Sequence, residues 1–314
     1  TGEYIGLLDH DDLLTVDALY ENVLALNNDK EIDFLYSDED KIDEEGKRTG
    51  PHFKPDYCPD NLLSRNYICH FSVIRATLIR QVGGFNIGYE GSQDYDLFLR
   101  VSENTNRIYH IPKVLYHWRI HSESTALNMD TKPYATNAAI KSLEDVLKRK
   151  NIGGEVSSVE HAAGFYSIRY DIENPQRVSI IIPTKDKAEM TDVCIASIFE
   201  LTDYIDYEVV LINNNSSEDS FFEMVKKWES KEPNRFKCIS DNGDFNFSRL
   251  MNNAASAATG EYLLLLNNDT EITHADWVKG MVEQAQRKSI GAVGARLLYK
   301  NDTIQHAGVI IGLR

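Results

Sequence analysis

The chain has 314 residues, of which 42% are hydrophobic and 26% charged, and this length is enough for about two domains at roughly 100–200 residues each. Its formal net charge of −16 excludes duplex nucleic acid and anionic lipid as main partners, because both require a basic surface. The charge does not exclude a nucleotide that is bound through a metal ion, where carboxylates are favourable.

Membrane and disulfide signals are absent from the sequence. No apolar run approaches the roughly 20 residues that span a bilayer. The four cysteines form no CxxC pair and no zinc-binding spacing, which is typical of reduced thiols in a cytoplasmic protein. The chain begins at Thr1 rather than Met, so the presence of an upstream targeting segment stays open.

The start of the chain is repeated near its end. Residues 1–11 (TGEYIGLLDHD) match residues 259–269 (TGEYLLLLNND) at seven of eleven positions, with an offset of 258 residues (259 − 1). The offset holds without a gap through Thr15 and Thr273. We interpret the chain as a fragment that holds one repeat period: the back of one module, a connector and the front of a second module.

The first 150 residues contain predicted helices and short strands, with an acidic loop at the beginning. Hydrophobic spacing predicts helices at 16–26, 75–82, 93–101 and 131–149, a strand at 34–36 and an extended segment at 115–120. Asp9 and Asp11 follow the first predicted strand, which we expect to be buried, and their i, i+2 spacing allows them to share Mg²⁺ or Mn²⁺. A solvated turn that caps the next helix is the alternative explanation.

Two further motifs in this half carry polar groups. Asp94 lies at the start of a predicted helix, where capping and the helix dipole alone explain an acid. In an extended segment His117, Arg119 and His121 lie on one face, because side chains alternate with a period of two. Such a face could hold a diphosphate or complete a metal site, or it could be a plain polar strand face.

The second half alternates strand and helix. Strands are predicted at 178–182, 207–212, 236–239 and 262–266, with helices at 189–200, 221–228 and 247–258. This alternation predicts an α/β fold with a mostly parallel sheet flanked by helices. Ligands of such sheets bind beyond the carboxyl ends of the strands, and polar residues follow those ends: Thr184, Asp186, Asn213, Asn267 and Asp269.

The order and spacing of these motifs resemble the large inverting family of glycosyltransferases with the GT-A fold, family 2. The matching features are a strand that ends in Pro183-Thr184-x-Asp186, an Asn cluster with Ser216, the repeated acidic loop, a Gln93-Asp94 pair and Arg119-x-His121. Other segments are similar to tandem-module, rhamnosyltransferase-like enzymes of bacterial cell-surface polysaccharide synthesis: residues 37–43, 53–55, 117–121 with Ser124 and Thr125, and 305–308.

The resemblance implies a GT-A-like, Rossmann-like fold in two partial modules. Residues 1–150 would be the acceptor-binding and catalytic half of a first glycosyltransferase module, 151–176 a connector, and 177–314 the nucleotide-binding half of a second module. The implied activity moves a sugar from a nucleotide-diphosphate sugar to a saccharide or lipid-linked saccharide, with Mg²⁺ or Mn²⁺ as cofactor. The expected location is the cytoplasm, with peripheral association of the parent protein at the inner face of the membrane.

The resemblance also implies roles for individual residues. In the first module these are Asp94 as general base, Asp9 at the ribose or metal, Arg119 at the phosphates, and Asp11 and His121 at the metal. In the second module Thr184, Asp186 and Asn213 would line the nucleotide pocket, Asn267 would lie at the donor, and Asp269 would bind the metal.

Two departures leave alternatives open. Asn213 stands where the family often has Asp, and Asn267 stands where the first copy has Asp9, so each removes a charge. The second module could therefore bind a saccharide or nucleotide sugar without catalysis. A nucleotidyltransferase is a second alternative, which a large distance between Asp94 and the acidic loop would favour. A third is one composite site from both halves, which requires Asp94 and Asp269 to be close.

Overall fold

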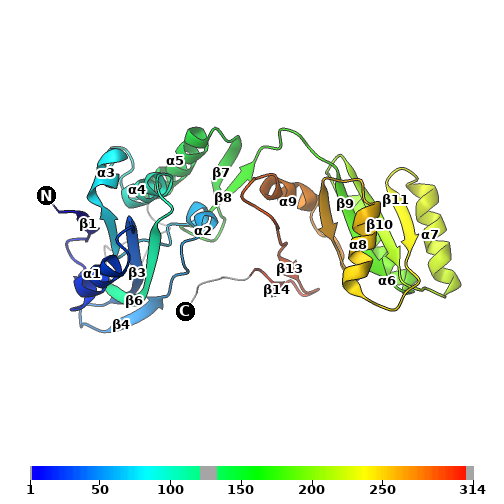
Figure 1. Ribbon diagram of the computed structural model, residues 1–314, viewed down its shortest axis with the longest axis horizontal. Coiled ribbons are helices and arrows are strands. Elements are labelled where there is room, and N and C mark those ends of the chain that lie inside the picture. The colour runs from blue at the N-terminus through cyan, green and yellow to red at the C-terminus, as the bar shows by residue number, and fades with distance from the viewer. Residues whose placement is uncertain (1, 121–132, 309–314) are drawn as a thin grey trace. The chain divides into compact units, whose positions relative to one another are not determined.

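A computed structural model of the protein describes residues 2–120 and 133–308. The chain divides into two compact units, one built on the first 170 residues and the other spanning Asp171–Gln305 (Figure 1). Each unit has its own hydrophobic core, and each is described here by itself.

The first unit is built on a mixed six-stranded sheet. Its strand order is β1-β5-β3-β6-β2, with β4 paired to β3 at one end. The β3–β6 pair is parallel, and the other pairs in this sheet are antiparallel. The strands are β1 Tyr4–Leu7, β2 Leu13–Leu14, β3 Phe34–Ile42, β4 Arg48–His52, β5 Ser72–Arg75 and β6 Ile108–Arg119.

Helices cover both faces of this sheet. On one face α4 and α5 pack with the β7–β8 hairpin over residues such as Phe34 and Tyr36, and on the other face α1 packs over Leu35. The helices are α1 Ala18–Asn28, α2 Pro59–Ser64, α3 Ala76–Gln81, α4 Gln93–Ser102 and α5 Pro133–Lys150; the hairpin strands are β7 Gly154–Ser158 and β8 Tyr166–Tyr170. Tyr166, Ile168 and Tyr170 of β8 belong to the core of this unit.

Two strands of this unit differ from the sequence-based expectation. Strand β3 was predicted to end at Tyr36, but it continues to Ile42 through four buried polar residues, 37–40. The carboxylates of Asp38, Glu39 and Asp40 have hydrogen-bond partners far away in the sequence, so they can be buried and the strand can continue. Strand β1 was expected to be buried, but it is an edge strand, and Ile5 and Leu8 are exposed.

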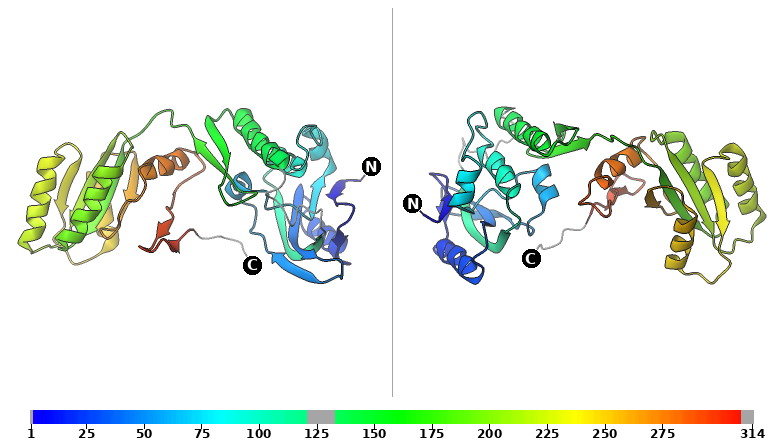
Figure 2. Two further views of the ribbon diagram at one scale, coloured as in Figure 1. Left: turned by 180° about the vertical axis from the view of Figure 1, so that it is seen from behind. Right: turned by 45° about the horizontal axis from the view of Figure 1, so that its top comes forward.

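The second unit is an α/β/α layer structure. Its main sheet is fully parallel with the order β11-β10-β9-β12. Ile180 and Ile182 face a core shared with α6, α7 and α9, whereas Ile181 faces a core shared with α8, so helices cover both faces (Figure 2). The elements are β9 Val178–Thr184, α6 Ala188–Leu201, β10 Tyr207–Asn213, α7 Asp219–Lys231, β11 Phe236–Ser240, α8 Phe247–Ala257, β12 Tyr262–Leu265, α9 Trp277–Ala285, β13 Leu297–Leu298 and β14 Ile304–His306.

The predicted order of strands and helices in this half is confirmed, and each predicted segment overlaps the observed element. The agreement follows from strong patterns: fully buried parallel strands are continuous apolar runs, and the helices between them alternate with a helical period. The four cysteines are free thiols. In the described part of the chain, no helix combines the length and the apolar character that crossing a membrane requires.

Candidate functional site

A pocket of about 330 Å³ in the first unit brings together two of the site residues that the sequence singled out there, Asp9 and Asp94. Asp9 and Asp94 both line it, although 85 positions separate them in the sequence. Its polar lining includes Asp9, Asn66, Cys69, His70, Gln93 and Asp94, and its apolar lining includes Phe85, Tyr95, Phe98, Trp118 and Tyr166. The pocket therefore offers two carboxylates and an imidazole beside aromatic side chains.

Asp94 lies in the first turn of α4, where the helix dipole favours a negative charge. The Asn66 amide Nδ2 donates a hydrogen bond of 2.9 Å to Asp94 Oδ2 and fixes the carboxylate. Burial raises the pKa of Asp94 above its ordinary value of 3.8, against the lowering effects of His70, of backbone amides and of Asn66. A carboxylate with a raised pKa accepts a proton more readily, which suits a general base.

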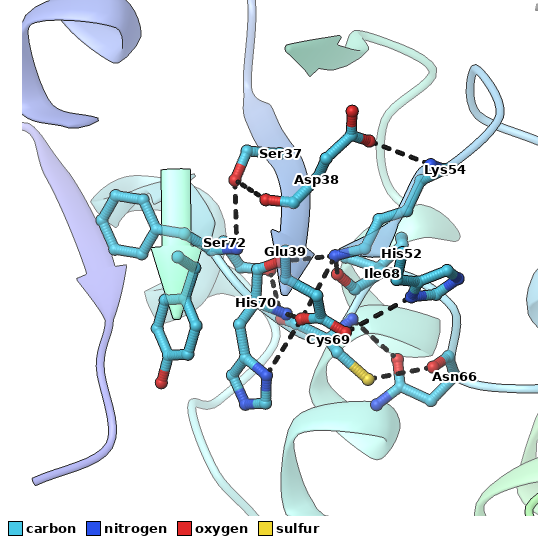
Figure 3. Close-up of polar contacts among 12 residues, drawn as sticks. Ser37, Asp38, Glu39, His52, Lys54, Asn66, Ile68, Cys69, His70 and Ser72 are labelled. Atoms are coloured by element: carbon cyan, nitrogen blue, oxygen red, sulfur yellow. Dashed lines mark hydrogen bonds and ion pairs between the residues drawn. The ribbon is translucent and has the colours of Figure 1, made fainter. Parts of the chain in front are cut away.

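His70 is held at the pocket wall by Glu39. Its Nδ1 lies 3.2 Å from Glu39 Oε2, and its backbone amide donates to the same oxygen at 3.1 Å (Figure 3). The ring stacks on Tyr116 with a centroid separation of 4.6 Å. Burial lowers the pKa of His70, but the hydrogen bond and charge of Glu39 outweigh burial, so the net shift is upward.

Glu39 itself is a buried carboxylate with several partners. It contacts His52 Nδ1 at 3.3 Å and the fully buried Lys54 Nζ at 3.4 Å, as well as His70 (Figure 3). Burial by itself raises the pKa of Glu39, but the charge of Lys54 and the hydrogen bonds from His52 and His70 hold it well below its usual value. Glu39 is therefore an anion that orients the His70 ring toward the pocket.

The acidic loop after β1 is attached to the end of β6. Asp12 is buried and accepts a 2.7 Å hydrogen bond from the Arg119 amide and another from the Tyr116 hydroxyl. Arg119 Nε donates to the Asp11 carbonyl at 2.6 Å. These contacts fix the loop backbone and join Arg119 to the acidic loop at Asp11.

Three potential metal ligands converge at this loop. One ligand atom each from Asp9, Asp12 and His70 lies within 4.8 Å of the others, and His70 Nε2 is 3.9 Å from Asp9 Oδ2. Asp11, predicted to share the ion with Asp9, is not a member of this group of described residues. His121, the other predicted ligand, lies outside the described residues.

The side chain of His117 contacts strand β3, whereas that of Arg119 contacts the acidic loop. His117 Nδ1 lies 2.5 Å from Asp40 Oδ1, and both residues are buried in the β3–β6 pair. This contact fits the alternative of a polar strand face, in which His117 satisfies a buried carboxylate.

In the second unit, polar residues gather at the carboxyl ends of neighbouring strands. Thr184 and Asn213 pair directly across β9 and β10, and both are buried. Asp186 accepts hydrogen bonds from the amides of Ser217 (2.7 Å) and Glu218 (3.0 Å) at the start of α7, and these bonds lower its pKa. The sequence-based expectation that these side chains share one edge of the sheet agrees with the geometry.

The loop after β12 reaches the same edge through Asn268. Its amide Nδ2 lies 3.2 Å from Thr184 Oγ1 and 3.1 Å from Thr191 Oγ1. Asn267 and Asp269 on either side of it are exposed.

Several residues of both sites were not assigned by the sequence. His70 and Asn66 carry no local signal, because their partners are distant in the chain. Glu39 lies in the segment 37–43 that resembles the family, but no role was assigned to it. Asp241 could have been found, since it directly follows β11 at the ligand-binding edge of the sheet. It is buried and pairs with Arg249 Nη2 at 2.9 Å, which anchors the start of α8.

Comparison with known proteins identifies the class of the second unit. Residues 179–309 match the family described as Glycosyl transferase family 2. This segment is therefore a glycosyltransferase family 2 domain, and the α/β, GT-A-like fold class predicted from the sequence is confirmed.

Two curated proteins are similar along nearly the whole chain. The O-antigen biosynthesis protein RfbC of Myxococcus xanthus is 40% identical over 312 residues, covering 99% of this chain and 24% of that protein. The uncharacterized protein y4gI of Sinorhizobium fredii is 42% identical over 315 residues, covering 99% of this chain and 34% of that protein. The chain thus spans about a quarter to a third of the length of these relatives.

One solved structure to which the chain is similar is the mannosyltransferase PcManGT from Pyrobaculum calidifontis in complex with GDP-Man and Mn²⁺. It is 23% identical, and the match covers 41% of this chain and 38% of that chain with a TM-score of 0.38.

Proposed function

We propose that the protein containing this chain is an inverting glycosyltransferase. It transfers a sugar from a nucleotide-diphosphate sugar to a saccharide or lipid-linked saccharide acceptor in cell-surface polysaccharide synthesis. The observation that carries the proposal is the shared pocket of Asp9 and Asp94, with a fixed carboxylate of raised pKa across from the acidic loop. The O-antigen biosynthesis relative supports the assignment to polysaccharide synthesis.

The organisation follows the repeat. Residues 1–150 supply the acceptor half of one module, 151–176 a connector whose β7–β8 hairpin packs on the core of the first unit, and 177–314 the nucleotide-binding half of the next. We place the protein in the cytoplasm, with peripheral association of the parent at the inner face of the membrane.

The residues of the pocket have distinct roles in this reaction. Asp94 takes the proton of the acceptor hydroxyl while the hydroxyl oxygen bonds to the anomeric carbon and the bond to the diphosphate breaks. A single displacement of this kind inverts the anomeric centre. Asn66 holds the Asp94 carboxylate, and Arg119 beside Asp11 faces the phosphates.

The donor set at the acidic loop fits a divalent cation. Carboxylate oxygens of Asp9 and Asp12 with the His70 imidazole form a compact group, and Asp11 and His121 remain proposed ligands from the same region. A bound Mg²⁺ or Mn²⁺ would neutralise the charge of the leaving diphosphate. Asp269 is the proposed ligand in the second unit, where Thr184, Asp186, Asn213 and Asn267 form the donor pocket.

A large distance between Asp94 and the acidic loop would have favoured a nucleotidyltransferase. Asp94 and Asp9 of that loop line the same pocket, so this alternative is less favoured. Binding without catalysis remains the second candidate for the second unit, because Asn213 and Asn267 lack the charge of aspartate. Calorimetric titration with UDP, dTDP and GDP, each with and without Mn²⁺, tests the donor proposal directly. Metal-dependent binding of one nucleotide supports a donor site in this chain, and binding of none of them contradicts it.

A further inference from the structure

Helix α1 carries an apolar stripe that faces solvent. Leu19 and Tyr20 are each 65% exposed, Val23 is 54% exposed and Leu24 is 39% exposed. Their spacing of i, i+1, i+4 and i+5 places them on one side of the helix. Four large apolar side chains on one exposed helix face are costly in water and indicate a covered surface.

The same stripe is buried in the other copy of the repeat. At the repeat offset the four residues correspond to Trp277, Val278, Met281 and Val282 of α9. Val278 and Val282 are 0% and 3% exposed, and all four pack on the core of the second unit. Trp277 Nε1 also donates a 2.9 Å hydrogen bond to Thr202 Oγ1 just after α6.

The opposite helix face shows the reverse pattern. Ala18 and Asn22 of α1 are buried at 0% and 4% exposure against the first unit. Their counterparts Asp276 and Gly280 are only partly buried, and a Cβ added at Gly280 would meet no atom within 4 Å. The repeated helix therefore has two packing faces, and each unit of this chain covers one of them.

The preceding strand shows the same division at its edges. Directly before β1, the Glu3 carbonyl accepts a 2.8 Å hydrogen bond from the Ala76 amide, which directly follows antiparallel β5. In β12, the Tyr262 amide donates to the Arg177 carbonyl at 3.3 Å beside parallel β9. Tyr4, the counterpart of Tyr262, is adjacent to Glu3, and successive residues of a strand direct their backbone groups to opposite edges. The two copies therefore use opposite edges of the same strand.

We propose that the outer edge of β1 and the α1 stripe form a docking surface for a nucleotide-binding half built like residues 178–258 of this chain. The occupant adds a parallel strand to β1, as β9 does to β12, and covers Leu19, Tyr20, Val23 and Leu24. It is supplied by the longer polypeptide to which this chain belongs, since the two relatives matched along 99% of the chain extend well beyond it.

The inference rests on the repeat and its packing, not on the proposed transfer reaction. Cysteine labelling tests it without donor or acceptor, so its outcome is separate from any result on activity. The variants are Val23→Cys in the stripe and Ile87→Cys as a matched apolar control, which is 95% exposed and lies elsewhere in the first unit. Each is made in the isolated chain and in the full-length gene product, and maleimide modification is followed at the individual peptide by mass spectrometry.

In the isolated chain we expect both cysteines to react at similar rates that do not depend on protein concentration. In the full-length protein we expect V23C to react at least about tenfold more slowly and I87C to keep its rate. Slower amide hydrogen exchange of residues 4–8 in the unmodified full-length protein is expected in parallel. Equal V23C rates in both proteins would overturn the proposal. Concentration-dependent protection in the isolated chain would also overturn it, because a second copy would then be the occupant.

Discussion

The buried Glu39 and the partly buried His70 form a pair that connects the core of the first unit to its pocket. The two ring nitrogens of His70 have different partners. Nδ1 lies 3.2 Å from the buried Glu39 Oε2, and Nε2 lies 3.9 Å from Asp9 Oδ2 at the pocket. Behind Glu39 lies Lys54, whose ammonium is fully buried and also donates to the carbonyls of Ile68 and His70. The network holds the His70 imidazole at the position where the acidic loop meets the pocket.

Glu39→Gln is expected to destabilise the protein by about 3–5 kcal/mol, because it leaves the buried Lys54 ammonium without its counter-charge. Urea unfolding followed by circular dichroism measures the change. The exposed Glu45→Gln in the β3–β4 turn is the matched control and should shift stability by less than about 0.5 kcal/mol. A loss in E39Q no larger than in E45Q would show that the network contributes little.

Asp94→Asn is expected to lower transfer by about 10²–10⁴-fold, since it removes the proposed base and keeps the shape of the side chain. Because burial raises the pKa of Asp94 above 3.8, the acid limb of kcat/KM should lie at a higher pH than an ordinary aspartate gives. Activity then falls as pH decreases through that pKa, because the base becomes protonated. The measurement is a pH–rate profile on the full-length enzyme, and unchanged activity in D94N would remove Asp94 from its role.

Glu208 is expected to make the second unit sensitive to acid. Burial raises its pKa, but Lys237, Ser179 and Thr259 donate to the carboxylate and lower the pKa to about 2 from 4.5. A lowered pKa in the folded state gives stability that is present above pH 4.5 and is lost as pH falls toward 2. The contribution is about 3 kcal/mol at neutral pH.

Unfolding free energies of the wild type and Glu208→Gln between pH 7 and pH 3 check this expectation. The difference between them should shrink as pH falls. A constant difference would mean that the hydrogen-bonded shape of the side chain, rather than its charge, provides the stability.

Gly260→Ala is expected to destabilise the second unit by about 1–3 kcal/mol or more, because the new Cβ would lie 2.6 Å from the Ser179 amide nitrogen and 2.7 Å from the Arg177 carbonyl. Both contacts are backbone atoms of the β9 region and cannot rotate away. Gly280→Ala in α9 is the control, since its Cβ meets nothing within 4 Å and alanine favours the helix by up to about 1 kcal/mol. Thermal unfolding should therefore move in opposite directions for the two variants.

Asp269→Asn is expected to weaken Mn²⁺-dependent nucleotide binding by the chain at least about tenfold, if the loop after β12 holds the metal. Glu271→Gln is exposed in the same loop and removes the same charge, so it should have little effect. Isothermal titration with the nucleotide that binds wild type compares the two. Equal weakening in both variants would point to general electrostatics instead of ligation.

The amino-acid sequence by itself determined the order of elements in the second unit and the edge of its sheet where polar residues gather. Both depend on local patterns: apolar runs such as 207–212, helical spacing between them, and the rule that parallel strands end at one edge. The repeat was also visible in the sequence, because a repeat is found by aligning residues and does not depend on their positions in space.

Only the tertiary structure decided that the acidic segment 37–40 is buried and that His70 and Asn66 belong to the pocket. Four consecutive polar residues favour a solvated loop locally, and burial becomes possible only when each group finds a partner. Asp38 bonds His110 at 2.8 Å and Asp40 bonds His117, partners more than 70 positions away. No local pattern records such pairings, because folding alone brings the partners together.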